Sequence, residues 1–169
     1  RLSDQVVVVY GAGAGGIGVA WALVEGMKRE GLSEEEAKAR VLVLDSKGLL
    51  VEGRSMEDYK RPYAQRPERL WGWRFAGEYP NLLETITNAR ATVLLGLSGQ
   101  AGSFTEPVVR AMLANTPRPV IFPLSNPTSA TEALPDDLVY WTEGRAPVAA
   151  GRPFPPGGLT GRTVPLAPG

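Results

Sequence analysis

The sequence predicts an α/β protein with a doubly wound, mainly parallel sheet that carries helices on both faces. Short apolar runs rich in β-branched and aliphatic residues recur along the chain, as expected for strands buried on both faces. Segments with the apolar spacing of helices separate these runs, in the alternation typical of β-α-β units. The first unit contains a glycine-rich turn between its strand and its helix.

The first expected strand covers residues 5–10, and a helix over residues 15–30 follows it. The turn between them places Gly11, Gly13 and Gly16 in G-x-G-x-x-G spacing. In this pattern the first glycine allows a tight turn, the second lets a pyrophosphate approach the backbone, and the third lets the helix pack on the strand. The pattern predicts a dinucleotide site in a Rossmann-like domain; the alternative is a tight turn without a ligand.

A second apolar strand covers residues 41–45 and ends in Asp45, after a short helix that Ser33 caps. Rossmann-like domains place the acid that binds the adenosine ribose at this position, usually about 20 residues after the glycines. The short helix accounts for the longer interval here. Asp45 is therefore predicted to bind the ribose, with a simple strand-end carboxylate as the alternative.

The rest of the chain continues the alternation as far as residue 150. Residues 51–80 are irregular, polar and aromatic, and we expect a long loop or short helices there. The other expected strands cover residues 92–98, 118–124 and 146–150, and the other expected helices begin at Asn81, Ser103 and Pro135. Because residues 151–169 are dense in proline and glycine, we expect a domain over 1–150 and an extended tail over 151–169.

Composition narrows the classes of function. The 18 basic and 18 acidic side chains balance, which gives no sign of a nucleic-acid partner. The chain has no cysteine, which excludes disulfides and thiolate metal sites. No apolar run approaches the roughly 20 residues of a membrane span, so we expect no membrane partner and a soluble cytoplasmic protein.

The chain also has no histidine, which removes the commonest general base. Simple lactate- or malate-dehydrogenase chemistry, which needs a catalytic histidine, is therefore excluded. None of the five tyrosines is followed by lysine in Tyr-x-x-x-Lys spacing, so a short-chain dehydrogenase is excluded too. A phosphate-binding loop of the G-x-x-x-x-G-K type is also excluded, because Val19 follows Gly18 where this loop needs lysine.

Several blocks of sequence, in order along the chain, resemble the nucleotide-binding domain of the malic enzyme family. The block Arg118–Ser129 is the most distinctive. The others are Gly11–Gly13, Glu30–Ser33, Val43–Val51, Leu95–Gln100, Thr142–Ala146 and Pro153–Pro156. The resemblance implies oxidative decarboxylation of malate to pyruvate and CO₂, with reduction of NAD or NADP.

The resemblance also implies which parts of the enzyme lie outside this chain. In the family, the lysine and tyrosine acid–base pair and the acidic ligands of a divalent metal, Mg²⁺ or Mn²⁺, precede the glycine motif. We therefore expect no catalytic or metal-binding residue in this chain, which should bind the cofactor without turning over malate. Malate is the expected substrate, and a homo-oligomer is the expected assembly.

Site residues follow from the resemblance by motif. The pyrophosphate would lie against Gly11, Gly13, Ala14, Gly16 and Ile17, the adenosine ribose against Asp45, and the nicotinamide side against Ser98 and Gly99. Asn126 would contact the nicotinamide ribose or the substrate; the alternative is a turn-forming asparagine before Pro127. An acid such as Asp45 favours NAD. Ser46 and Lys60 resemble residues of NADP-preferring members, so NADP is the expected coenzyme and NAD is the alternative.

Two other functions stay open at this stage. One is a nucleotide-sensing module that kept the fold and lost the chemistry. The other is a different oxidoreductase, such as an amino-acid dehydrogenase, that shares this half of the fold. The residues on either side of this segment would distinguish the three.

Overall fold

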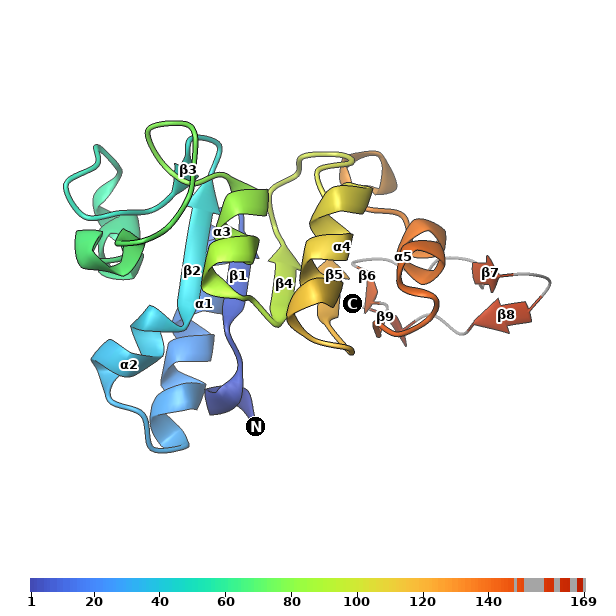
Figure 1. The fold of residues 1–169 in the computed structure, drawn as a ribbon, viewed down its shortest axis with the longest axis horizontal. Coiled ribbons are helices and arrows are strands. Elements are labelled where there is room, and N and C mark those ends of the chain that lie inside the picture. The colour runs from blue at the N-terminus through green and yellow to red at the C-terminus, as the bar shows by residue number, and fades with distance from the viewer. Residues whose placement is uncertain (148, 151–156, 160–161, 165–166, 169) are drawn as a thin grey trace.

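In a computed structural model of the chain, described for residues 1–147, 149–150, 157–159, 162–164 and 167–168, a central sheet separates two layers of helices (Figure 1). The strands of the first 147 residues are β1 (Val7–Tyr10), β2 (Val41–Asp45), β3 (Gly48–Leu49), β4 (Val93–Gly96) and β5 (Val120–Pro123). The α-helices are α1 (Ala14–Arg29), α2 (Glu34–Ala39), α3 (Leu82–Ala89), α4 (Glu106–Asn115) and α5 (Pro135–Thr142). Short 3-10 helices cover Leu2–Asp4, Asp58–Tyr63, Pro67–Leu70 and Thr128–Ala130.

The sheet has the strand order β3-β2-β1-β4-β5. β1 pairs in parallel with both β2 and β4, and β5 pairs in parallel with β4. From β1 the chain adds β2 and β3 on one side of the sheet. It then crosses back and adds β4 and β5 on the other side. Ligands of such sheets bind beyond the carboxyl ends of the strands at this reversal, which here lies between β1 and β4. The predicted doubly wound α/β fold is confirmed.

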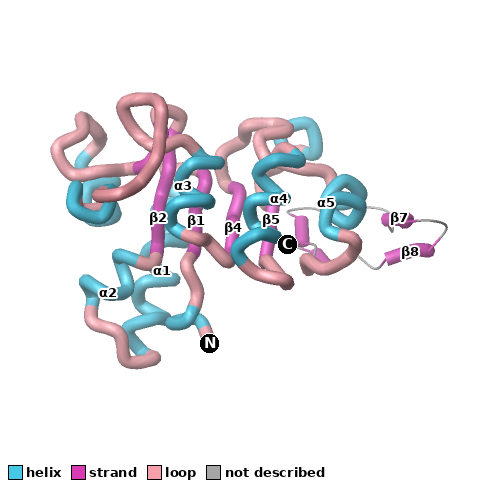
Figure 2. Tube along the Cα trace, in the orientation of Figure 1, coloured by secondary structure: helices cyan, strands magenta, loops and turns pink. Residues whose placement is uncertain are grey.

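Each face of the sheet has its own apolar core. Val7 and Val9 point to one face, where they meet α1 and α2 through residues such as Val24 and Ala37. Val8 points to the other face and belongs to a core with residues of α3, α4 and α5. The tube view shows α3 and α4 in front of the sheet (Figure 2). The valine run therefore forms a strand buried on both sides, which is why it shows no polar alternation.

The helix starts follow the predicted capping chemistry. The Ser33 side chain accepts a hydrogen bond from the Glu36 amide, and the Glu36 side chain accepts one from the Ser33 amide. Asn81 and Glu84 form the same reciprocal pair at the start of α3. These boxes satisfy amides that a helix start otherwise leaves without an intrahelical partner.

The structure departs from the sequence expectations in two places. β3 pairs antiparallel with β2 through a tight turn after Asp45, and two residues are too few for a periodic signal. The segment expected as a strand over 146–150 contains, among its described residues, only β6 (Ala149–Ala150), which pairs with β9 (Ala167–Pro168) and not with the central sheet.

Within 151–169, β7 (Gly157–Leu159) and β8 (Arg162–Val164) form an antiparallel pair. In the described part of the chain, no helix is long and apolar enough to span a bilayer.

Candidate functional site

The glycine turn joins β1 to α1 with main chain packed against main chain. Gly11 has a φ of +130°, and a Cβ there would lie 2.4 Å from the Leu97 carbonyl oxygen of the neighbouring β4 loop. A Cβ at Gly16 would lie 1.8 Å from the Gly11 carbonyl oxygen. Neither distance is possible for a real side chain, so close packing requires glycine at both positions.

Gly13 is different, because a Cβ added there would meet no atom within 4 Å. Gly13 is the N-cap of α1, and Gly13, Ala14 and Gly15 are all exposed to solvent. In the described chain, no side chain caps α1 and no acidic residue lies in its first turn. The first amides and the positive end of the helix dipole are thus available to an anion, which is the arrangement that binds a diphosphate.

A cavity of about 240 Å³ lies beside this turn, at the carboxyl ends of β1, β2 and β4. It is lined by Tyr10, Gly11, Ala12, Gly13, Asp45, Ser46, Lys60, Leu97, Ser98 and Gln100. The structure thus brings six predicted site residues to one cavity, although they are far apart in the sequence. Of the other five, Ala14, Gly16 and Ile17 lie in α1, and Gly99 and Asn126 lie on exposed loops beyond β4 and β5.

Asp45 is held in place by three donors. Its carboxylate forms an ion pair with Arg54, accepts a hydrogen bond of 2.9 Å from the Lys47 amide, and lies 3.6 Å from Lys60 Nζ. Partial burial acts to raise the pKa of Asp45, but the hydrogen bonds and the two cations prevail and lower it. The carboxylate is therefore ionised at neutral pH and can accept hydrogen bonds from a ribose.

Arg54 was missed as a functional residue from the sequence. Its guanidinium is buried, and besides Asp45 it donates to the carbonyl oxygens of Gly48 and Leu49, both at 3.1 Å. It also lies over the Tyr79 ring, 5.4 Å from the centroid. An arginine in a polar, irregular segment gives no signal of burial, so only the folded loop identifies it.

Lys60 is nearly buried and lies between two carboxylates. Its Nζ is 2.9 Å from Glu57 and 3.6 Å from Asp45. Burial acts to lower the pKa of Lys60, but the hydrogen bond to Glu57 and the attraction of both acids raise it. The ammonium is thus fully charged and partly neutralised by its neighbours before any ligand arrives.

Glu132 was also missed from the sequence. It contacts Ser98, which lines the cavity. This carboxylate is fully buried and accepts hydrogen bonds from Ser98 and Ser125, which follow β4 and β5. Asn126 comes next and is joined to Pro127 by a cis peptide bond. In the sequence, Glu132 follows a Pro-Thr-Ser turn and resembles any solvated acid.

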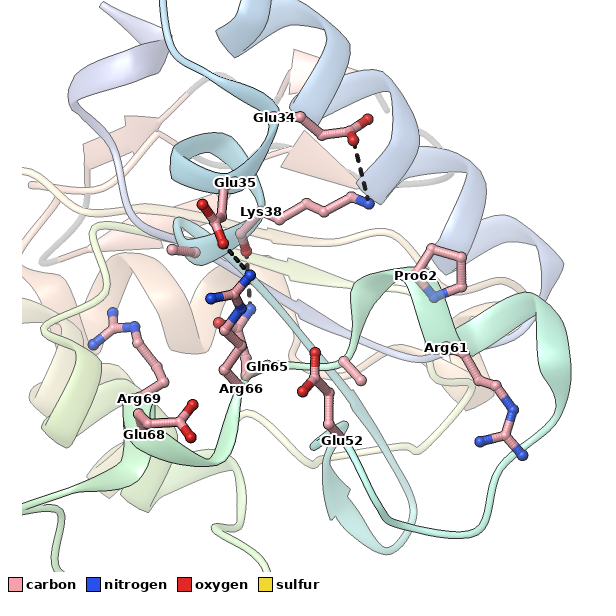
Figure 3. A pocket seen from close by; sticks show the side chains of 12 residues that line it. Glu34, Glu35, Lys38, Glu52, Arg61, Pro62, Gln65, Arg66, Glu68 and Arg69 are labelled. Atoms are coloured by element: carbon pink, nitrogen blue, oxygen red, sulfur yellow. Dashed lines mark hydrogen bonds and ion pairs between the residues drawn. The ribbon is translucent and has the colours of Figure 1, made fainter.

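A second and larger cavity of about 670 Å³ lies beside α2 and the segment before α3 (Figure 3). Four acidic and four basic side chains line it, and they neutralise one another. Arg66 pairs with Glu35, and Lys38 Nζ lies 4.0 Å from Glu34. None of the glycines of the turn reaches this cavity. A diphosphate would find neither net positive charge nor a helix N-terminus of useful length there.

Within the described residues, no three carboxylates lie close enough together to hold a metal ion. The cavity offers three kinds of polar group: the uncapped amides at the start of α1, the Asp45 carboxylate, and Ser98 after β4.

Comparisons with known proteins agree with this geometry. Residues 1–169 match the protein family described as "Malic enzyme, NAD binding domain". A NAD-dependent malic enzyme of Pseudomonas savastanoi is 46% identical over 168 residues, which are 98% of this chain and 30% of that protein. One of Edwardsiella ictaluri is 44% identical over 168 residues, covering 99% of this chain and 30% of that protein. The chain thus spans 30% of the length of these two relatives.

Proposed function

The chain belongs to the malic enzyme family, whose NAD-binding domain it matches over its whole length, and we propose that it binds the coenzyme for oxidative decarboxylation of malate. The observation that carries this proposal is the open space at Gly13, above a helix start that no side chain caps in the described chain. A side chain at Gly13 would fill that space, while Gly11 and Gly16 are glycine for packing. The residues present therefore fit a dinucleotide.

A bound nicotinamide would supply the hydride acceptor for the oxidation of malate at C2. This chain contributes binding and orientation: the Gly13 turn receives the diphosphate, Asp45 accepts hydrogen bonds from the adenosine ribose, and Ser98 and Gly99 border the nicotinamide. Asn126 contacts the nicotinamide ribose or malate. We propose that the acid–base residues and the ligands of a divalent metal belong to other parts of the protein.

For the choice of coenzyme we propose NAD. The ionised Asp45 repels the 2′-phosphate of NADP and accepts hydrogen bonds from the free 2′-hydroxyl of NAD. Glu57 and Asp45 already neutralise Lys60, which weakens the argument that Lys60 and Ser46 make for NADP. The relatives are named as NAD-dependent. NADP, the coenzyme expected from the sequence, is the alternative that the substitution at Lys60 tests.

The test of the proposed function is coenzyme binding and turnover. We expect calorimetry on the 169-residue chain to detect NAD binding, after circular dichroism has shown that the chain is folded. We expect the chain alone to show no malate-dependent reduction of NAD, and the whole protein to show it. A folded chain that binds neither NAD nor NADP would contradict the proposal.

A substitution at Lys60 tests the choice of coenzyme. Lys60→Gln removes the one lysine of the cavity lining, so we expect the affinity ratio of NAD to NADP to rise by about fivefold, since a charge-assisted contact to a phosphate is worth more than 1 kcal/mol. Lys47→Gln is the matched control, because Lys47 is exposed on the adjacent turn. An unchanged ratio in Lys60→Gln would show that Lys60 does not face the 2′ position.

A further inference from the structure

Glu132 is a buried acid without a basic partner among the described residues. It lies between the 3-10 helix Thr128–Ala130 and α5, and its side chain is fully inaccessible to solvent. Burying a carboxylate costs several kcal/mol unless hydrogen bonds compensate for the lost water. An apolar residue would fill this space at lower cost. We therefore look for the role of Glu132 in its hydrogen bonds.

The fold makes room for this carboxylate at Gly96, the last residue of β4. A Cβ at Gly96 would lie 2.6 Å from Glu132 Cδ, so any other residue there would displace the acid. The Glu132 carboxylate therefore lies against the end of β4, at the strand reversal where the predicted coenzyme site is located.

Four donors reach the two carboxylate oxygens. Oε2 accepts from the Ser98 amide at 2.8 Å, from Ser98 Oγ at 2.6 Å and from Ser125 Oγ at 2.6 Å. Oε1 accepts a longer contact of 3.4 Å from the Ser125 amide. One acid thus joins the loop after β4 to the loop after β5.

The acid also fixes the direction of both hydroxyl groups. Both serine hydroxyls donate to Glu132 Oε2 and keep their lone pairs for other donors. Those donors are loop amides: the Gln100 amide lies 3.0 Å from Ser98 Oγ, and the Gly99 amide lies 2.9 Å from Ser125 Oγ. The conformation of the loop 98–100 therefore depends on Glu132 through both serines.

We propose that Glu132 is a positioning residue of the coenzyme site, which holds the loops after β4 and β5 in the arrangement that receives the nicotinamide half. This inference rests on the proposed function. It assigns no contact with the adenosine half, because Gly13 at the start of α1 and Asp45 at the end of β2 have no hydrogen bond to this network among those described.

The experiment compares two ligands in the whole protein by calorimetry. NAD carries the nicotinamide, whereas ADP-ribose carries only the adenosine, diphosphate and second ribose. In Glu132→Gln, which keeps the shape but replaces one carboxylate oxygen by an amide group that donates, we expect the affinity ratio of NAD to ADP-ribose to fall by about fivefold. The control Thr142→Val removes a buried hydroxyl that donates to the Leu138 carbonyl within α5, and it should leave the ratio unchanged.

Two outcomes would overturn the inference: an unchanged ratio in Glu132→Gln, or an equal loss of affinity for both ligands. If the unsubstituted protein binds neither ligand, the proposed function itself fails, and this result is distinguishable from the other two. Should Glu132→Gln not fold, Ser125→Ala removes only the hydroxyl that joins Glu132 to the Gly99 amide. The same fall in the ratio is expected there, and an unchanged ratio would again overturn the inference.

Discussion

Replacing Gly13 by valine is expected to weaken NAD binding by about a hundredfold, since losing two charge-assisted hydrogen bonds costs about 3 kcal/mol. The added side chain would occupy the space in front of the first amides of α1, where the diphosphate is expected to lie. Because φ of Gly13 is −74° and no atom lies within 4 Å of the new Cβ, the protein should fold normally. The measurement is calorimetry with NAD, beside a thermal unfolding curve.

Gly18→Val provides the matched control for this substitution. Gly18 also lies on α1, is exposed, and leaves its Cβ position free of neighbours within 4 Å, but it does not line the cavity. We expect NAD affinity to stay within about twofold of the original in this variant. Equal losses in the two variants, or full affinity in Gly13→Val, would place the coenzyme elsewhere.

The parts of the fold that repeat a local pattern were predictable from the sequence. Val6 to Val9 showed a buried strand, the glycine spacing showed the turn, and Ser33 and Asn81 showed helix starts. Each of these signals comes from residues near one another in the chain. The family resemblance added the order of the blocks, which periodicity alone cannot supply.

The parts that depend on tertiary contacts were not predictable. Arg54 and Glu132 are charged residues in irregular segments, where the default expectation is solvent exposure. Their burial depends on partners from other elements: the carbonyls beside β3 for Arg54, and the ends of β4 and β5 for Glu132. The sequence therefore indicated candidate site residues such as Asp45 and Ser98, but it did not indicate the side chains that hold them in place.

Arg54→Met is expected to lower the free energy of unfolding by about 3 kcal/mol, the cost of removing one partner of a buried ion pair. Methionine retains much of the side-chain volume but leaves Asp45 without its closest cation. It also leaves the Gly48 and Leu49 carbonyl oxygens without the guanidinium. Denaturant unfolding measures the loss, and NAD binding should weaken with it because Asp45 is no longer fixed.

The pH dependence of this variant follows from the lowered pKa of Asp45. In the folded protein this pKa lies below the ordinary carboxyl value of about 3.9, so the stabilisation is complete above about pH 5 and is lost as pH falls through the folded pKa. Arg54→Met raises the folded pKa toward the ordinary value. Its stability should therefore fall less than that of the unsubstituted protein between about pH 5 and pH 2.

Arg66→Met separates burial from charge pairing. Arg66 also forms a close ion pair with a carboxylate, that of Glu35, but both side chains are mostly exposed, 65% and 68%, against 3% and 15% for Arg54 and Asp45. Water and salt screen such a pair, so its removal should cost no more than about 1 kcal/mol and leave NAD binding unchanged. If the two variants lost equal stability, the Arg54–Asp45 pair would be only a surface contact. In that case the orientation of the carboxylate that we propose selects NAD would need another origin.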